Sequence, residues 1–224
     1  MASLILFCGG EKIYGGNNPK PLMSHNDKIL IVEYLNKIKN SNFNSIFLLV
    51  ENEDYKNFEF LTAFKNLEIL RVDDQSSTLQ KVKKILNENY DDIHENIFFS
   101  YPDIIYDQEI FIHTFDSSLD LKITPLKSRF PEIIRDRFSD NIKGITIFDS
   151  PVPANPTFIF AGVAAIKKAV LKKQLKDFVA RNGVDSNFEV DFFQFMIDQN
   201  LAKYQIYSGK WKTIDSIKDF LQYL

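Results

Sequence analysis

A glycine-rich loop that carries two lysines follows the first apolar run of the chain. The segment Leu6–Leu22 contains Gly9 and Gly10, then Lys12, and later Lys20 between two prolines. Glycines let backbone N–H groups close on phosphate oxygens without obstruction by a side chain, and a lysine adds a cation. The segment predicts a phosphate-binding loop, although turn glycines beside a surface lysine would give the same pattern.

An aspartate stands where a buried strand should end. Asp103 follows the apolar run Asn96–Tyr101, with only Pro102 between them. A carboxylate in this place can hold Mg²⁺, which prefers one or two carboxylates together with phosphate oxygens. The alternative is a turn aspartate that follows proline.

Composition restricts the classes of protein. The chain has 224 residues, of which 45% are hydrophobic and 25% charged. Its net charge is −3 and its acidic and basic residues are well mixed along the sequence, which argues against a nucleic-acid-binding surface. No window approaches the length of a membrane span, and no basic stretch precedes the short apolar N-terminus. A single cysteine, Cys8, excludes an intrachain disulfide. We expect a cytoplasmic protein that binds neither nucleic acid nor membranes.

Strand and helix patterns alternate along the first half of the chain. Continuous apolar runs predict buried strands, and apolar residues at helical spacing predict helices, the first with Asp27 as its cap. This alternation indicates a mostly parallel sheet covered on both faces, in which ligands bind at the carboxyl ends of the strands. The expected strands are Leu4–Cys8, Ser45–Val50, Leu67–Val72 and Asn96–Tyr101, and the expected helices are Asp27–Lys39, Tyr55–Phe64 and Ser76–Leu86.

The second half is less regular. Its apolar patterns predict strands at Leu119–Leu126, Gly144–Phe148, Thr157–Val163 and Ala202–Tyr207, and helices at Ala164–Val179, Phe188–Gln199 and Asp215–Tyr223. For the last helix, Asp215 is a plausible N-cap.

A polar segment, Arg129–Asn141, interrupts the strand pattern of the second half. Arginine binds phosphate or carboxylate in a two-pronged way, so we expect a lid or an acceptor-binding insertion. The alternative is that its arginines form surface ion pairs with neighbouring acids. The arginines are Arg129, Arg135 and Arg137, and the acids are Glu132, Asp136 and Asp140.

Taken together, these segments resemble nucleotidyltransferases of the GT-A-like α/β fold, most closely the glucose-1-phosphate cytidylyltransferases. That family has a Gly-Gly loop with Pro-Lys-Pro, a strand-borne Phe-Thr-Tyr-Gly-Asp and a late Gly-Phe-Trp-x-x-Met-Asp-Thr. The corresponding segments here are Gly9–Pro21, Phe99–Asp103 and Gly209–Ser216. Asp73–Thr78 resembles a Ser/Thr-rich segment that lines the family's nucleotide pocket, and Ala161–Gly162 its Asn-Gly-Gly strand. The resemblance covers nearly the whole chain.

The resemblance implies a single Rossmann-like domain over residues 1–224, with a mixed, mostly parallel sheet and helices on both faces. Residues 1–105 would form the nucleotide-binding half and residues 106–224 the acceptor-binding half. The implied reaction transfers a nucleoside monophosphate, CMP from CTP, to a phosphorylated small molecule with release of pyrophosphate. Mg²⁺ would be the cofactor, the product would serve surface polysaccharide (capsule or lipopolysaccharide) biosynthesis or modification, and a homo-oligomer would be compatible with the family.

The resemblance also implies a role for each matched residue. Lys20 and Lys12 would be catalytic cations, and Asp103 and Asp215 would hold the metal. The nucleotide-binding residues would be Gly9, Gly10, Gln75, Ser76, Ser77 and Asp103, and the acceptor-binding residues Arg129, Arg135, Arg137 and Gly162.

The sequence departs from the family at several places, one of which is the absence of the Gly-Gly that follows the family's Ser/Thr-rich segment. The loop lacks the arginine that contacts the triphosphate, Pro102 replaces the glycine before the metal aspartate, and Ser150 replaces the lysine that grips the sugar phosphate. A serine brings no charge. We therefore expect an acceptor other than glucose-1-phosphate, such as another sugar phosphate or a phosphorylated amino acid.

Two other functions fit the same resemblance. A GT-A glycosyltransferase usually carries Asp-x-Asp, and no such triplet follows a strand here. A nucleotide-binding relative without catalysis is favoured by the missing loop arginine, whereas Asp103 and Asp215 argue against it.

Overall fold

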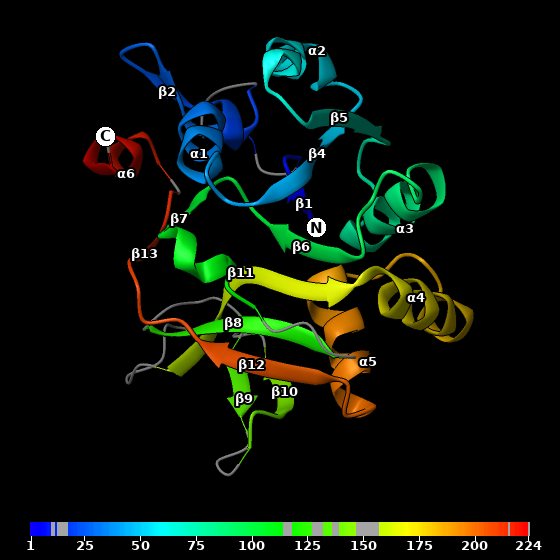
Figure 1. The fold of residues 1–224 in the computed structure, drawn as a ribbon. Coiled ribbons are helices and arrows are strands. Elements are labelled where there is room, and N and C mark those ends of the chain that lie inside the picture. The colour runs from blue at the N-terminus through cyan, green and yellow to red at the C-terminus, as the bar shows by residue number, and fades with distance from the viewer. Residues whose placement is uncertain are drawn as a thin grey trace.

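The structure, a computed structural model, describes residues 1–9, 12, 18–113, 118–126, 132–135, 139–146, 157–214 and 216–223. Its main feature is a nine-stranded sheet with the strand order β10-β9-β11-β6-β1-β4-β5, to which β8 and β12 are added through β11 (Figure 1). Strand β11 of the second half pairs with β6 of the first half. One continuous sheet therefore carries both parts of the chain.

The first half supplies the parallel part of the sheet. Strand β1 lies between β4 and β6 and is parallel to both, and β5 continues the parallel set beyond β4. Because parallel strands end at the same edge, the residues that follow them meet there. The bounds of these strands are Ala2–Phe7 (β1), Phe43–Glu51 (β4), Leu67–Val72 (β5) and Asn96–Ser100 (β6).

The second half adds strands that are mostly antiparallel. Strand β11 is antiparallel to β6, β8 and β9, and β9 is antiparallel to β10, whereas β12 runs parallel to β8. The bounds are Leu119–Leu126 (β8), Glu132–Arg135 (β9), Ile142–Thr146 (β10), Thr157–Lys167 (β11) and Ala202–Ile206 (β12).

Two of the expectations for the second half are wrong. The helix expected from Ala164 begins only at Lys168, because Ala164 to Lys167 pair with β6 and complete the long strand β11. The segment Arg129–Asn141 does not interrupt the sheet, since Glu132–Arg135 within it forms strand β9. In both cases pairing with a distant strand decides the conformation, and local periodicity does not contain that information.

Helices cover both faces of the sheet (Figure 1). On one face, residues of α3, α4 and α5 share one apolar core with the sheet, and on the other face residues of α1 and of the α2–η2 segment share a second core. The expected α/β fold with helices on both faces is confirmed. The bounds are Leu30–Ile38 (α1), Tyr55–Phe58 (α2), Glu59–Ala63 (η2), Thr78–Glu88 (α3), Lys168–Asn182 (α4), the π-helical η4 at Phe188–Phe192, and Phe193–Asp198 (α5).

Smaller elements frame the carboxyl edge of the sheet. Strand β7 (Ile104–Tyr106) pairs with β13 (Trp211–Thr213), and helix α6 (Ile217–Tyr223) follows. A hairpin of β2 (Ser24–His25) and β3 (Lys28–Ile29) precedes α1. Asp27 lies in the turn of this hairpin with a φ of 62° and does not cap α1, so that expectation is wrong. Over the described residues, no helix is long and apolar enough to cross a membrane.

Candidate functional site

The central contact of the site joins Lys20 to Asp103. Lys20 Nζ lies 3.1 Å from Asp103 Oδ2, and the side chains are 14% and 24% exposed. Lys20 opens the short 3₁₀ helix η1 (Lys20–Leu22), whose N–H groups at Leu22 and Met23 bond back to Pro19 and Lys20. Proline on both sides of Lys20 restricts the backbone. The local sequence therefore holds the lysine in a fixed direction.

The C-terminal segment that contains β13 and Ile214 also contacts Asp103. Asp103 lies between β6 and β7, and β7 pairs with β13. The Ile214 N–H donates a 2.8 Å hydrogen bond to the Asp103 carbonyl. Asp215, the second expected metal ligand, lies outside the described residues, and so does Gly10. The chain thus brings the residue before Asp215 against Asp103, although more than a hundred positions separate them in sequence.

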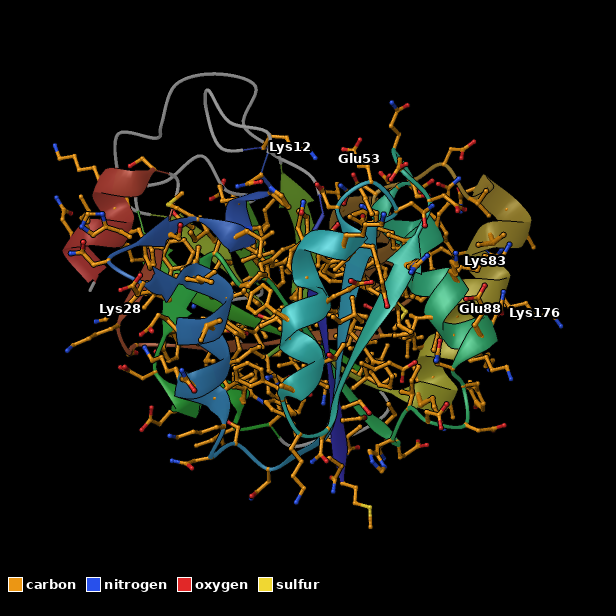
Figure 2. The ribbon with its side chains drawn as sticks, turned by 90° about the horizontal axis from the view of Figure 1, so that it is seen from above. Lys12, Lys28, Glu53, Lys83, Glu88 and Lys176 are labelled. Carbon is orange, nitrogen blue, oxygen red and sulfur yellow. The ribbon has the colours of Figure 1, made fainter. Side chains whose placement is uncertain are left out.

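Lys12 of the glycine loop is held by two carboxylates that follow β4. Its Nζ lies 2.7 Å from Glu53 Oε1 and 2.8 Å from Asp54 Oδ2, and Figure 2 shows Lys12 and Glu53 close together at one edge of the molecule. The Lys12 side chain is 34% exposed, more than that of Lys20. Its backbone forms a β-bridge with Pro19. Both lysines of the loop therefore lie at the carboxyl edge of the sheet.

A third lysine at this edge was not expected from the sequence. Lys81 on α3 is buried, and its Nζ lies 2.8 Å from Glu51 Oε1 at the end of β4. Glu51 in turn packs against Gly9, where an added Cβ would stand 3.0 Å from Glu51 Cγ and Oε1. A larger residue at position 9 would require the Glu51 side chain to shift, so the close approach of Glu51 favours glycine here independently of any ligand.

Two signals in the sequence could have found this pair. Glu51 directly follows the apolar run Ser45–Val50, the pattern that singled out Asp103. Lys81 lies four residues before Ile85, which places a charge on the apolar face of α3. A lysine on that face needs a partner, because an unpaired buried charge is strongly disfavoured.

The expected nucleotide-binding segment Gln75–Ser77 forms the start of α3. The Ser77 hydroxyl accepts the Gln80 N–H at 3.2 Å and donates to the Val184 carbonyl at 2.9 Å, in a capping box with the Gln80 side chain. Gln75 is exposed in a turn with a φ of 63°. The Ser77 hydroxyl is thus committed to capping the helix, and nucleotide contacts of Gln75 and Ser76 remain a prediction.

A partly buried tyrosine links the two halves of the chain beside the site. The Tyr101 hydroxyl donates to Glu189 of η4, and the Thr78 hydroxyl donates to the same carboxylate at 2.8 Å. The Tyr101 ring stacks on Phe7 with 5.4 Å between ring centroids. Burial, together with the nearby Glu189 charge, raises the pKa of Tyr101 well above its usual value. Tyr101 is therefore a neutral hydrogen-bond donor at physiological pH.

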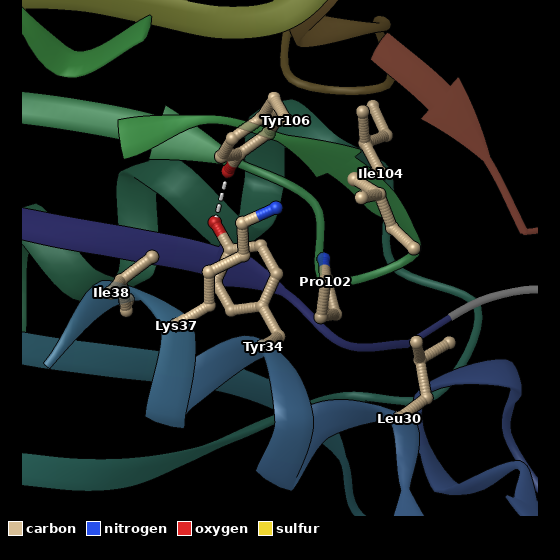
Figure 3. A pocket seen from close by; sticks show the side chains of 8 residues that line it. Leu30, Tyr34, Lys37, Ile38, Pro102, Ile104 and Tyr106 are labelled. Atoms are coloured by element: carbon tan, nitrogen blue, oxygen red, sulfur yellow. Dashed lines mark hydrogen bonds between the residues drawn. The ribbon is translucent and has the colours of Figure 1, made fainter. Parts of the chain in front are cut away.

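A second buried cluster supports the turn that carries Asp103. The hydroxyls of Tyr34 and Tyr106 are hydrogen-bonded to each other (Figure 3), and Ser100 Oγ lies 2.6 Å from the Tyr106 hydroxyl. Pro102 and Ile104, on either side of Asp103, line a pocket here of about 10 Å³, room for one water at most. Burial raises the pKa of the neighbouring Cys8 thiol, which keeps it protonated and inert. This region is support rather than a binding site.

Gly162, an expected acceptor residue, has a structural reason to be glycine. Its φ is 77°, and a Cβ there would stand 2.1 Å from Ile104 Cδ1. The preceding Ala161 carbonyl accepts the Trp211 indole N–H at 2.8 Å. These contacts join Ala161 and Gly162 of β11 to Trp211 of β13 and Ile104 of β7, so the three strands are held together next to Asp103.

Of the three expected acceptor arginines, the structure describes Arg135. Its guanidinium carbon lies 3.5 Å from the centroid of the Phe158 ring and 5.5 Å from that of Tyr204, so it stacks on aromatic rings. Asp140 is one of the acidic residues expected to pair with these arginines, and its Oδ2 lies 3.6 Å from Lys203 Nζ. Arg129 and Arg137 lie outside the described residues, and acceptor binding by the three stays a prediction.

Carboxylates at the carboxyl edge offer oxygen ligands that suit a hard divalent cation. Asp103 is one, and its partner from the sequence analysis, Asp215, adjoins Ile214. Oxygens of Glu51, Glu53 and Asp54 also lie within 4.8 Å of one another, but the ammonium groups of Lys12 and Lys81 already bond to this cluster. Asp103 also bonds to an ammonium group, that of Lys20, so both groups of carboxylates at this edge are paired with lysines.

Comparison with solved structures supports the fold. The crystal structure of HddC from Yersinia pseudotuberculosis superposes with a TM-score of 0.74 at 14% sequence identity, over 99% of this chain and 97% of that one. No protein-family profile matches the sequence, and no curated protein matches it significantly. At this identity the likeness shows the fold alone, a mixed α/β sheet with helices on both faces, and the chemistry must be argued from the site.

Proposed function

We propose that this protein is a Mg²⁺-dependent nucleotidyltransferase that transfers CMP from CTP to a phosphorylated small molecule and releases pyrophosphate. The observation that carries the proposal is the contact between Lys20 and Asp103, which places a cation beside a metal-binding type of carboxylate at the carboxyl edge of the sheet. Gly9 and Lys12, the described residues of the glycine loop that follows β1, lie at the same edge. In sheets of this kind ligands bind at that edge.

The reaction joins two anions. A phosphate oxygen of the acceptor attacks the α-phosphorus of the NTP in line, the bond from this phosphorus to the bridging oxygen of the β-phosphate breaks, and pyrophosphate leaves with the electron pair. The acceptor oxygen is already anionic, so no general base is required. The task of the protein is to position the anions and to stabilise charge.

Three groups of the chain would share this task. Lys20 neutralises the α-phosphate and the incoming acceptor phosphate, and Asp103 fixes its ammonium between them. Lys12 binds the triphosphate from the glycine loop. Mg²⁺ would be held by Asp103 and Asp215, and when bound it supplies positive charge beside the α-phosphate.

The acceptor is proposed to differ from glucose-1-phosphate. In the family that the sequence resembles, a lysine grips the sugar phosphate at the place of Ser150. Other acceptor anions that suit the chain are another sugar phosphate or a phosphorylated amino acid, bound by Arg129, Arg135 and Arg137. A product of this kind would serve surface polysaccharide biosynthesis or modification.

The test is a pyrophosphate-release assay with each of the four NTPs against phosphorylated sugars, polyols and amino acids, with and without Mg²⁺. We expect release with CTP that requires both Mg²⁺ and an acceptor other than glucose-1-phosphate. Efficient turnover of glucose-1-phosphate would refute the acceptor proposal. Tight CTP binding without release for any acceptor would instead identify a nucleotide-binding relative that has lost catalysis.

A further inference from the structure

Two lysines from different parts of the fold share one cluster of carboxylates. Oxygens of Glu51, Glu53 and Asp54 lie within 4.8 Å of one another. Lys12, from the glycine loop, bonds to Glu53 and Asp54, and Lys81, from α3, bonds to Glu51. If the triphosphate reaches Lys12, it also comes close to Lys81.

The Lys81 side chain is directed toward the start of the glycine loop and away from solvent. Its side chain is 7% exposed. Its positive charge lowers the pKa of the Cys8 thiol, although burial of that thiol has the larger, opposite effect. This influence on Cys8 indicates that the ammonium lies near the end of β1. Its partner Glu51 packs on Gly9. The Glu51–Lys81 ion pair therefore lies directly against Gly9, the first glycine of the loop.

A buried ion pair of this kind is weak evidence for stability. Removing two charges from water costs about as much as their attraction returns, and apolar residues of similar size are often equally or more stable. A lysine ammonium has three donors. Among the described residues, the Lys81 ammonium donates one hydrogen bond, to Glu51 Oε1 at 2.8 Å. Glu51 thus fixes the ammonium in place while its remaining donors can bond a ligand.

The two cation groups stand on opposite sides of β1. Lys20 and Asp103 lie at the β6 side, and Lys12 and Lys81 at the β4 side, since β1 is paired with β6 on one side and β4 on the other. A triphosphate laid across the end of β1, with its α-phosphate at Lys20, would extend its terminal phosphates toward Lys12 and Lys81.

We propose that Lys81, oriented by Glu51, binds the β- or γ-phosphate of the nucleoside triphosphate together with Lys12. This inference rests on the proposed function and adds a residue from α3 to the triphosphate site. Lys81 keeps its bond to Glu51 and donates to a phosphate oxygen as well, so no buried carboxylate is left unpaired on binding.

The test uses a double variant that removes the pair without leaving a buried charge. Glu51→Leu combined with Lys81→Met should unfold within a few degrees of wild type, because apolar side chains replace the ion pair. Its affinities for CTP, CMP and pyrophosphate are measured by calorimetry. Lys83→Met is the matched control, since Lys83 lies on the same helix toward α4, away from the glycine loop (Figure 2).

We expect the double variant to bind CTP and pyrophosphate about tenfold more weakly or worse, as for the loss of a charge-assisted hydrogen bond. Its binding of CMP, and all binding by Lys83→Met, should match wild type. A double variant that binds CTP and pyrophosphate as wild type does, or that loses CMP binding equally, overturns the inference. Wild-type protein that binds no NTP refutes the proposed function as well, whereas wild-type turnover with an unaffected double variant refutes this inference alone.

Discussion

Lys20 Nζ and Asp103 Oδ2 lie 3.1 Å apart, although 83 positions separate the two residues in sequence. The contact connects the loop after β1 with the turn after β6, two neighbouring parallel strands. It makes the two residues depend on each other, because Asp103 orients the lysine and the lysine neutralises Asp103. The first two predictions below follow from this arrangement.

Lys20 should matter more for turnover than Lys12. Lys20 is the more buried of the two and is fixed between prolines, whereas Lys12 is one-third exposed. Loss of a preorganised cation in the transition state typically costs about 3 kcal/mol, or a hundredfold in rate. We expect Lys20→Ala to lower kcat for pyrophosphate release at least about a hundredfold and Lys12→Ala to act mainly on the KM for CTP. Lys28→Ala, at an exposed position on β3, serves as the control, and near-normal turnover of Lys20→Ala would disprove the proposed geometry.

Asp103→Asn should lower activity through the metal. An asparagine keeps the size of the side chain but loses the charge that pairs with Lys20 and that, in the proposed site, attracts Mg²⁺. We expect kcat to fall about a hundredfold and the Mg²⁺ concentration for half-maximal rate to rise. The measurement is a Mg²⁺ titration of pyrophosphate release, with Asp91→Asn, an exposed aspartate after α3, as the control. An unchanged Mg²⁺ requirement would remove Asp103 from the metal site.

Gly162→Ala should destabilise the protein more than Gly183→Ala does. Both glycines have positive φ angles, which cost an alanine roughly 1–2 kcal/mol. Only at Gly162 would the new Cβ also overlap Ile104 Cδ1, at 2.1 Å, since nothing lies within 4 Å at Gly183. We expect a loss of about 3 kcal/mol or more against about 1 kcal/mol in urea unfolding. Adding Ile104→Val, which removes that methyl group, should recover part of the loss, and equal costs at the two glycines would contradict the packing argument.

Acidification should weaken the fold through His113. This histidine is buried against Phe98 and near Asp120 and Lys122, and burial lowers its pKa below the usual 6.5. Between its folded-state pKa and 6.5 the unfolded chain binds more protons than the folded one, so the free energy of unfolding falls as the pH drops through 6.5. His113→Phe should show a shallower loss of stability from pH 7 to pH 5 in urea unfolding than wild type does. Parallel curves for His113→Phe and wild type would show that His113 does not titrate in this way.

The sequence alone determined the regular parts of the fold. Strand Leu67–Val72 and strand Leu119–Leu126 have the bounds that the sequence indicated, because the apolar residues that recur along each of them pack into the cores of the sheet. It also located the lysine between prolines and the aspartate after β6, because loop residues at strand ends carry the chemistry in parallel sheets.

The tertiary structure alone decided which distant residues meet. It extended β11 through Lys167 and turned Glu132–Arg135 into a strand, since pairing partners lie far away in sequence. In the packed chain the Ser77 hydroxyl caps a helix and Arg135 stacks on Phe158. The side chain of Ile104 leaves no room for a Cβ at Gly162. The tertiary structure also assembled Glu51 and Lys81 beneath Gly9 from three separate segments. Periodicity reports how each segment faces the core, whereas a site depends on distances between segments, which only the packed chain defines.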